Sequence, residues 1–224
     1  MTSSYPRSPA DVRAWPADPA ARKALEEGLS APPQDSDDVG QVLDGSGLDF
    51  TGADLSGLEL TEAEFSEAQL SGVRLAEADL YRAWLIGTTL RGANLSGARL
   101  RKVEGRRCDA RDAILRDTDL ERSEFEEADF KGADLSGAIF GRASFARADL
   151  RGANLQDCKF ASTVGSANLW QARLAGARLD RATGLVSGPV DVGPDGPHFI
   201  DGDDLHDWFA SQGAPEVQVT SPKS

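Results

Sequence analysis

Large apolar residues recur at every fifth position through the middle of the chain. From Phe50 to Phe160 there are 23 positions spaced by five, and 21 of them are Leu or Phe; the exceptions are Gly105 and Ala110. Two residues before these positions, Ala occurs 14 times, and most of the other residues there are small. A helix buries about every 3.6th residue and a half-buried strand every second one. The spacing therefore indicates a chain that bends once in each pentapeptide.

Four such bends would close a square coil of about 20 residues. The large and the small residue of each pentapeptide would both point inward, and successive coils would stack about 4.8 Å apart, the spacing of hydrogen-bonded strands. Each coil would bury its core only against its neighbours, which makes the object a solenoid. Residues 46–183 are long enough for about seven coils.

Several segments resemble a known family. GADLSGLEL, GANLSGARL, GADLSGAIF and RGANLQDCKF are similar to the A-(D/N)-L-X-X motif of pentapeptide-repeat proteins. The resemblance implies an all-β solenoid, a right-handed quadrilateral β-helix. The motif is much less specific for function. Some members of the family protect bacterial DNA gyrase from quinolones or peptide toxins, and some are thought to mimic duplex DNA.

The repeat has two irregularities. After Phe160 the large residues come one position early, which predicts that one residue is deleted near 161–164. At Gly105 and Ala110 the apolar column loses bulk. That loss marks either a functional bend, where a partner could insert, or a gap that neighbouring side chains fill; we favour the gap.

The N-terminal segment, residues 1–45, is predicted to contain a helix at about 18–29. Asp18 followed by Pro19 is typical of an N-cap with proline at the first helical position. The stretch APPQDSDD, residues 31–38, is predicted to be a linker because of its prolines and polar residues. This helix would cover the exposed core at that end of the solenoid.

The C-terminal segment, residues 184–224, is predicted to hold a Gly/Pro loop, a helix at about 203–212 and a flexible tail. Leu205, Trp208 and Phe209 would share one face of this helix by their i, i+3, i+4 spacing. That face could build a homodimer or lie over the last coil as a cap.

No pattern in the sequence points to catalysis, a cofactor or a metal. Cys108 and Cys158 both occupy the small inward position, about 2.5 coils apart, so they are expected to be free, buried and unreactive thiols. His198 and His206 stand near four aspartates, but we predict no metal site there. We expect the protein not to be an enzyme.

The net charge of −13 argues against nonspecific binding to nucleic acid or to an anionic membrane. The repeat itself contains 22 acidic and 19 basic residues. A rod of about 33 Å that copied B-DNA would need about 19 negative charges, so complete DNA mimicry is disfavoured. The chain has no long apolar run, and its first residues lack the pattern of a signal peptide, which favours a cytoplasmic protein.

Residues 20 apart should stack on one face of the coil. One face is predicted to be basic. Because opposite charges are interleaved throughout, we favour plain solvated surface over a binding role for the charged faces. The next face carries a glutamate-rich group, Glu124, Glu126 and Glu127, together with the outward apolar residues Trp84 and Ile86, and Tyr81 lies near the corner. We interpret the apolar residues either as a contact patch or, preferably, as residues covered by the N-terminal helix through Leu25 and Leu29. The predicted basic residues are Arg82, Arg99, Arg101, Lys102, Arg122, Arg142, Lys159, Arg178 and Arg181.

The most specific functional hypothesis is binding and protection of DNA gyrase, in antibiotic resistance or self-immunity, by contact with the acidic face. The alternative is an interaction scaffold that binds an unrelated protein through the apolar patch or the basic face.

Overall fold

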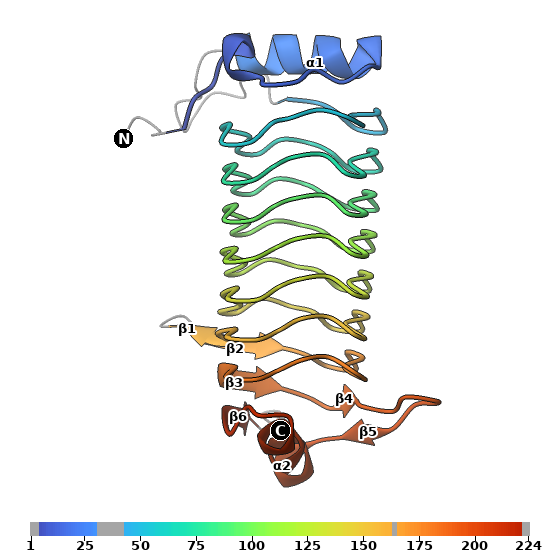
Figure 1. The fold of residues 1–224 in the computed structure, drawn as a ribbon, viewed down its shortest axis with the longest axis vertical. Coiled ribbons are helices and arrows are strands. Elements are labelled where there is room, and N and C mark those ends of the chain that lie inside the picture. Colours follow the sequence, from blue (N-terminus) through green and yellow to red (C-terminus); the bar gives the residue numbers. More distant parts are fainter. Residues whose placement is uncertain (1–4, 31–42, 163–164, 221–224) are drawn as a thin grey trace.

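The computed structural model describes residues 5–30, 43–162 and 165–220. They form a stack of similar coils with a helix at each end (Figure 1). Parallel bridges join residues 20 apart, as in the column that runs from Asp44 through Glu64 and Trp84 to Glu104. The period of five in the sequence therefore corresponds to four sides per coil.

Each pentapeptide builds one turn and one side of the coil. The second turn residue adopts a left-handed backbone, as at Gly97 (φ 67°) and Arg82 (φ 59°). Glycine adopts this conformation without strain, and exposed charged residues also occupy it along the rod. Three residues later, the large apolar residue of the next pentapeptide donates its backbone N–H to the next coil. Leu75 N, for example, lies 2.7 Å from Asn94 O.

The core is a set of columns of Leu and Phe with Ala in the corners. Phe125 packs edge-on against Phe130, with 5.2 Å between ring centroids, and lies 5.4 Å from Phe145. Its ring also fills the space above Gly105, where an added Cβ would collide with it. The bridges continue unbroken past Gly105 and Ala110. The lost bulk at Gly105 is thus a gap that a neighbouring side chain fills.

The predicted deletion near 161–164 is wrong. Ser144 bridges Asn168, 24 residues later instead of 20, so this coil contains four additional residues. Part of the insertion forms a hairpin of β1 (Ala161–Ser162) and β2 (Gly165–Asn168). In a repeat of five residues, adding four residues and removing one residue shift the apolar pattern by the same amount. The sequence pattern therefore does not distinguish an insertion from a deletion.

The insertion also corrects the predicted basic face. Arg178 bridges Asn154 and lies on the column of Asp54 and Arg74, whereas Arg99 and Lys159 lie on the neighbouring column. Arg181 follows at the next corner, where its guanidinium pairs with Asp157.

The N-terminal end is closed by a short 3-10 helix, η1 (Pro9–Asp11), and by α1 (Pro19–Ser30). Helix α1 lies across the end of the rod (Figure 1), and Leu25 and Leu29 are buried in the core. We had expected this helix to cover Trp84. It does not, because Trp84 lies two coils further along the rod. The predicted linker, residues 31–38, lies outside the described residues.

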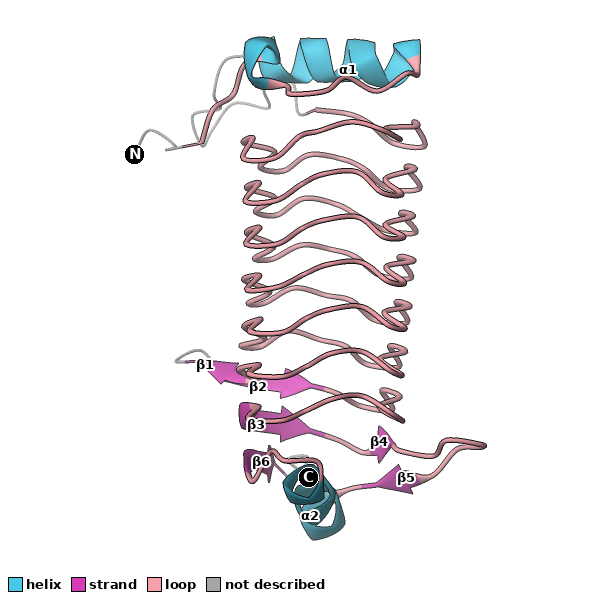
Figure 2. Cartoon of the chain, in the orientation of Figure 1, coloured by secondary structure: helices cyan, strands magenta, loops and turns pink. Residues whose placement is uncertain are grey.

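The C-terminal end is closed by α2 (Gly202–Ser211) and β6 (Glu216–Thr220), as Figure 2 shows. Strand β6 pairs in parallel with β3 (Thr183–Ser187), so part of the expected flexible tail is a strand. The four strands of this sheet have the order β1-β2-β3-β6. Between β3 and α2 in the sequence, β4 (Val190–Asp191) and β5 (Phe199–Ile200) form a projecting antiparallel hairpin.

Candidate protein-binding surface

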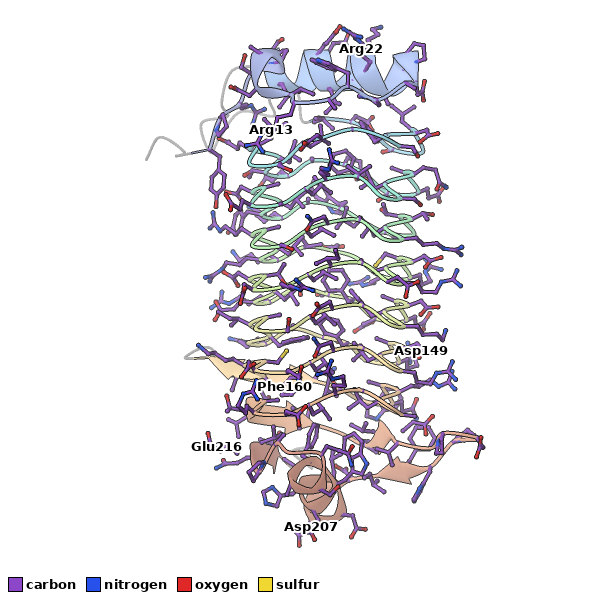
Figure 3. All side chains as sticks on the ribbon, viewed as in Figure 1. Arg13, Arg22, Asp149, Phe160, Asp207 and Glu216 are labelled. Atoms are coloured by element: carbon purple, nitrogen blue, oxygen red, sulfur yellow. The ribbon has the colours of Figure 1, made fainter. Side chains whose placement is uncertain are left out.

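Two adjacent sides of the rod differ in how their outward charges are paired. On one side the acids and bases pair with one another, and on the other several glutamates have no cation partner; this difference defines the candidate site. We call one side the Asp149 face; its outward column contains Thr89, Asp109, Asp129, Asp149 and Arg173. We call the other the Trp84 face; its outward column contains Glu64, Trp84, Glu104, Glu124, Ser144 and Asn168. Side chains cover the whole length of the rod (Figure 3).

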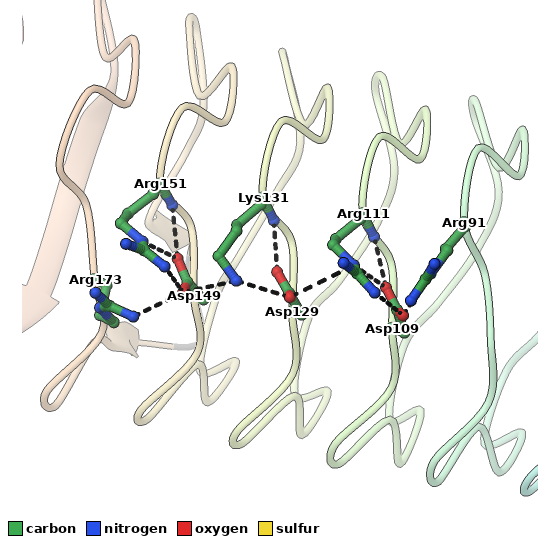
Figure 4. Close-up of polar contacts among 8 residues, drawn as sticks. All are labelled: Arg91, Asp109, Arg111, Asp129, Lys131, Asp149, Arg151 and Arg173. Carbon is green, nitrogen blue, oxygen red and sulfur yellow. Dashed lines mark hydrogen bonds and ion pairs between the residues drawn. The ribbon is translucent and has the colours of Figure 1, made fainter.

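On the Asp149 face the acids and bases neutralise one another. The Asp149 carboxylate forms ion pairs with three cations. Its Oδ2 lies 3.1 Å from Lys131 Nζ, 2.8 Å from Arg151 Nη2 and 3.0 Å from Arg173 Nη1. Lys131 continues the ladder to Asp129, and Figure 4 shows its further extension to Arg91. The ladder is therefore complete without any partner.

The pKa of Asp149 reflects these contacts. Burial raises it, but hydrogen bonds from Arg151 and Lys131 outweigh that effect and lower the pKa to about 2. The carboxylate therefore keeps its charge through most of the acidic range.

On the Trp84 face the acids divide into two groups. Arg106 pairs with Glu124, and Arg147 pairs with Glu127 at 2.7 Å. Four other glutamates have no cation within ion-pair distance among the described residues: Glu64, Glu67, Glu104 and Glu126. This face consequently presents carboxylates that a partner could neutralise.

The three apolar candidates do not form one patch. Trp84 and Ile86 are half-buried on the Trp84 face. Tyr81 instead lies among cations: Lys102 Nζ is 2.7 Å from its hydroxyl, and the Arg99 guanidinium lies 4.8 Å from the ring centroid. The hydrogen bond from Lys102 lowers the pKa of Tyr81.

The predicted basic face is neutralised only in part. Three of its arginines have ion-pair partners, whereas four of its cations have none among the described residues: Lys102, Arg122, Arg142 and Lys159. Arg99 pairs with Asp79 at 3.0 Å, and Arg101 pairs with Glu121 at 3.0 Å. Arg82 pairs with Glu62 at 3.1 Å. Surface ion pairs of this kind contribute little stability each, but they leave less free positive charge for a partner.

Trp170 was missed by the sequence reasoning. The residue is 40% exposed, which makes it one of two large apolar residues so exposed among those described. It follows Leu169 just as Ile86 follows Leu85, so restarting the count after the insertion would have found it. It lines a hollow of about 470 Å³ together with Glu126, Ala146, Arg147, Asn168 and Gly188.

The C-terminal candidates belong to the cap. Leu205 and Phe209 are fully buried, and the Phe209 ring centroid lies 6.1 Å from that of Phe160. Trp208 is half-buried and packs edge-on against Phe209 at 5.3 Å.

The thiols and histidines are placed as follows. Cys108 and Cys158 are free and buried, and burial raises the pKa of both thiols. The His206 ring nitrogen Nδ1 lies 2.9 Å from the backbone oxygen of Val217. Within the described ranges, no three His, Cys, Asp or Glu side chains are grouped so that they could hold a metal ion.

The repeat itself identifies the family. Residues 46–75, 74–104, 106–142 and 128–164 match the family described as pentapeptide repeats, with eight copies. Together these segments cover more than half of the chain. The chain belongs to the pentapeptide-repeat family.

Solved structures similar to this pentapeptide-repeat protein include other members. A pentapeptide-repeat protein from the Arabidopsis thaliana thylakoid lumen is 29% identical, with 44% of this chain and 69% of that chain covered and a TM-score of 0.44. HetL, involved in heterocyst differentiation regulation in Nostoc sp. strain PCC 7120, is 23% identical, with coverages of 80% and 83% and a TM-score of 0.38.

QnrB1, a plasmid-mediated fluoroquinolone resistance protein, is 17% identical, with coverages of 79% and 88% and a TM-score of 0.36. Because these TM-scores are low, the family assignment rests on the repeat. Comparison with curated protein sequences gives no match. None of the helices in the described parts of the chain is long and apolar enough to cross a lipid bilayer.

Proposed function

We propose that this pentapeptide-repeat protein is a non-catalytic rod that binds another protein, in the cytoplasm, through its Trp84 face. One observation carries the proposal: this face keeps four glutamates without cations and two half-buried apolar residues, whereas the adjacent Asp149 face neutralises its own charges. A surface with unpaired charge beside apolar area gives a partner both electrostatic and hydrophobic contacts.

DNA gyrase is the first partner to test, by the resemblance to the gyrase-protecting branch of the family. The pairing of charges limits how such binding would work. Since many carboxylates along the rod are paired with arginine or lysine, the rod does not offer the continuous free charge of a duplex. A local contact through the Trp84 face fits these charges better than complete mimicry of DNA.

The right-handed winding and the number of about seven coils are part of this proposal. Membership of the family supports the winding, and the 20-residue spacing of the bridges supports the number of coils. A homodimer through the C-terminal segment would have to use Trp208, Phe199 or the outer edge of β6. Leu205 and Phe209 are already buried in the cap.

The test is a gyrase supercoiling titration with and without a quinolone, using the purified protein. We expect inhibition of supercoiling, or protection from the drug, at about micromolar protein. Two variants locate the contact. In one, Glu64, Glu67, Glu104 and Glu126 are all changed to Lys, and in the other, Trp84 and Ile86 are both changed to Ser.

Loss of the effect in the charge-reversed variant alone would support electrostatic recognition of gyrase. Loss in the Ser variant alone, with an unchanged circular dichroism spectrum, would favour an apolar contact. No effect of the wild-type protein in either arm would overturn the gyrase proposal and leave the alternative of an unrelated protein partner.

A further inference from the structure

We infer that the hollow beside Trp170 binds an arginine or lysine side chain from a basic segment of a protein partner. The inference rests on the proposed protein-binding function and specifies the chemistry of the contact. The hollow lies on the Trp84 face, at the corner where Glu126, Ala146 and Trp170 follow one another along the rod.

Glu126 provides a fixed carboxylate at this hollow. Ser144 Oγ donates a hydrogen bond to Glu126 Oε1 at 3.2 Å, and Asn168 Nδ2 in turn donates to Ser144 Oγ at 3.2 Å. Neither donor is charged, and no cation of the described chain pairs with Glu126. The carboxylate is therefore oriented by neutral groups and keeps its negative charge available.

Trp170 provides an aromatic surface next to that carboxylate. The Arg147 guanidinium carbon lies 5.6 Å from the ring centroid, and Arg147 also pairs with Glu127. Arg147 is thus neutralised within the rod. Arg106, which also attracts Glu126, pairs with Glu124, so no described cation lies within ion-pair distance of Glu126 itself. Trp170 as a residue is 40% exposed, so it still offers area to a second cation.

The hollow is large and open enough to admit a long basic side chain. Its volume of about 470 Å³ exists because two buried small residues, Ala146 and Gly188, line it. A guanidinium can pair with a carboxylate and stack on an indole at once, which makes arginine the better fit. The net charge of −13 attracts a basic peptide segment and disfavours nucleic acid as the occupant.

The experiment measures binding of a fluorescein-labelled (Arg-Gly)4 peptide by fluorescence anisotropy at low and at physiological salt. The matched control peptide has citrulline, which is neutral and of the same shape, in place of each arginine. We expect binding of the arginine peptide to exceed that of the citrulline peptide by about tenfold at low salt and to weaken as salt is added.

Variants assign the binding to the hollow. Trp170→Ala and Glu126→Gln should each weaken the arginine peptide by about three- to fivefold. Glu104→Gln removes the same charge from an unpaired position of the same face and should change the affinity by less than about 1.5-fold. Glutamine at 126 can still accept the Ser144 hydrogen bond, so this variant should fold normally, which circular dichroism checks.

Equal losses in Glu104→Gln and Glu126→Gln would overturn the inference, because they would show diffuse attraction to the acidic rod. Equal binding of the citrulline peptide would overturn it as well. Failure of this inference can be told apart from failure of the proposed function. A gyrase effect that survives Trp170→Ala would overturn the role of the hollow and leave the proposed function standing.

Discussion

At the residue scale, the pair Gly105 and Phe125 shows how the core tolerates an irregular repeat. A Cβ added to Gly105 would lie 2.2 Å from Phe125 Cε1, so the glycine is small because the ring above occupies its space. The sequence shows the loss of bulk at 105, and the identity of the side chain that fills it comes only from the packing.

We predict that Gly105→Ala destabilises the rod by about 1–3 kcal/mol, the usual cost of overpacking a filled core. Phe125→Leu in the same chain should remove most of that cost, since the smaller side chain makes room. Urea unfolding followed by circular dichroism measures both variants.

Gly196→Ala is the control for this prediction, because nothing lies within 4 Å of an added Cβ at that position. It should be close to neutral. A Gly105→Ala protein as stable as the wild type would show that Phe125 moves aside without cost.

Also at the residue scale, most inward positions could be assigned from the sequence, whereas the surface site could not. An inward Leu or Ala is fixed by the period alone. Tyr81 and Trp84 are three residues apart, yet one lies among cations and the other beside unpaired glutamates. That difference depends on residues 18 to 21 positions away on the next coil.

At the element scale, each cap covers the end of the rod where a terminal coil has no neighbouring coil to pack against. Helix α1 buries Leu25 and Leu29 against the first coil, and α2 buries Leu205 and Phe209 against the last. The sequence predicts both helices to within a residue or two. The surface that each helix covers is set by how the terminal segment folds back onto its end of the rod, and the sequence does not show this.

Leu25→Ala should cost about 2–5 kcal/mol of local stability, because it leaves a cavity under a fully buried side chain. In a solenoid each coil contacts only its neighbours, so the damage should stay near the N-terminal end. Hydrogen exchange should show faster exchange of the Phe50 amide and unchanged exchange of the Phe130 amide, both of which donate to the following coil.

Lys23→Ala is the matched control on the same helix. Lys23 is 73% exposed and pairs with Glu27 at 3.6 Å, so its loss should change stability by less than about 0.5 kcal/mol. Uniform loss of protection along the rod in Leu25→Ala would show instead that all coils unfold as one unit.

At the scale of the whole molecule, the charge ladder makes the stability of the rod depend on pH. The folded pKa of Asp149 is about 2, below its ordinary value of 3.8. The unfolded chain therefore binds the proton first as pH falls, and the contribution of Asp149 is present above about pH 4 and lost as pH falls through about 2.

We predict that Asp149→Asn lowers the free energy of unfolding by on the order of 1 kcal/mol at pH 7, after allowance for solvent screening, and by much less near pH 2. Denaturant unfolding at pH 7, 4 and 2 measures the difference. Asp195→Asn, at the exposed tip of the β4–β5 hairpin, is the control and should change little at any pH. A difference between wild type and Asp149→Asn that stays constant with pH would contradict the assigned role of the carboxylate.

The sequence by itself determined the solenoid, the inward residues and the presence of a helix near each end, because a period of five with a small residue two before a large one leaves few other ways to bury both. The tertiary structure alone decided how the repeat changes register and which charges meet. Four added residues and one missing residue shift a five-residue pattern identically, so only the 24-residue spacing of bridges such as Ser144 to Asn168 distinguishes them. Ion pairs such as Lys131 to Asp149, and the hollow beside Trp170, form between coils, where contact depends on the spacing of stacked chains.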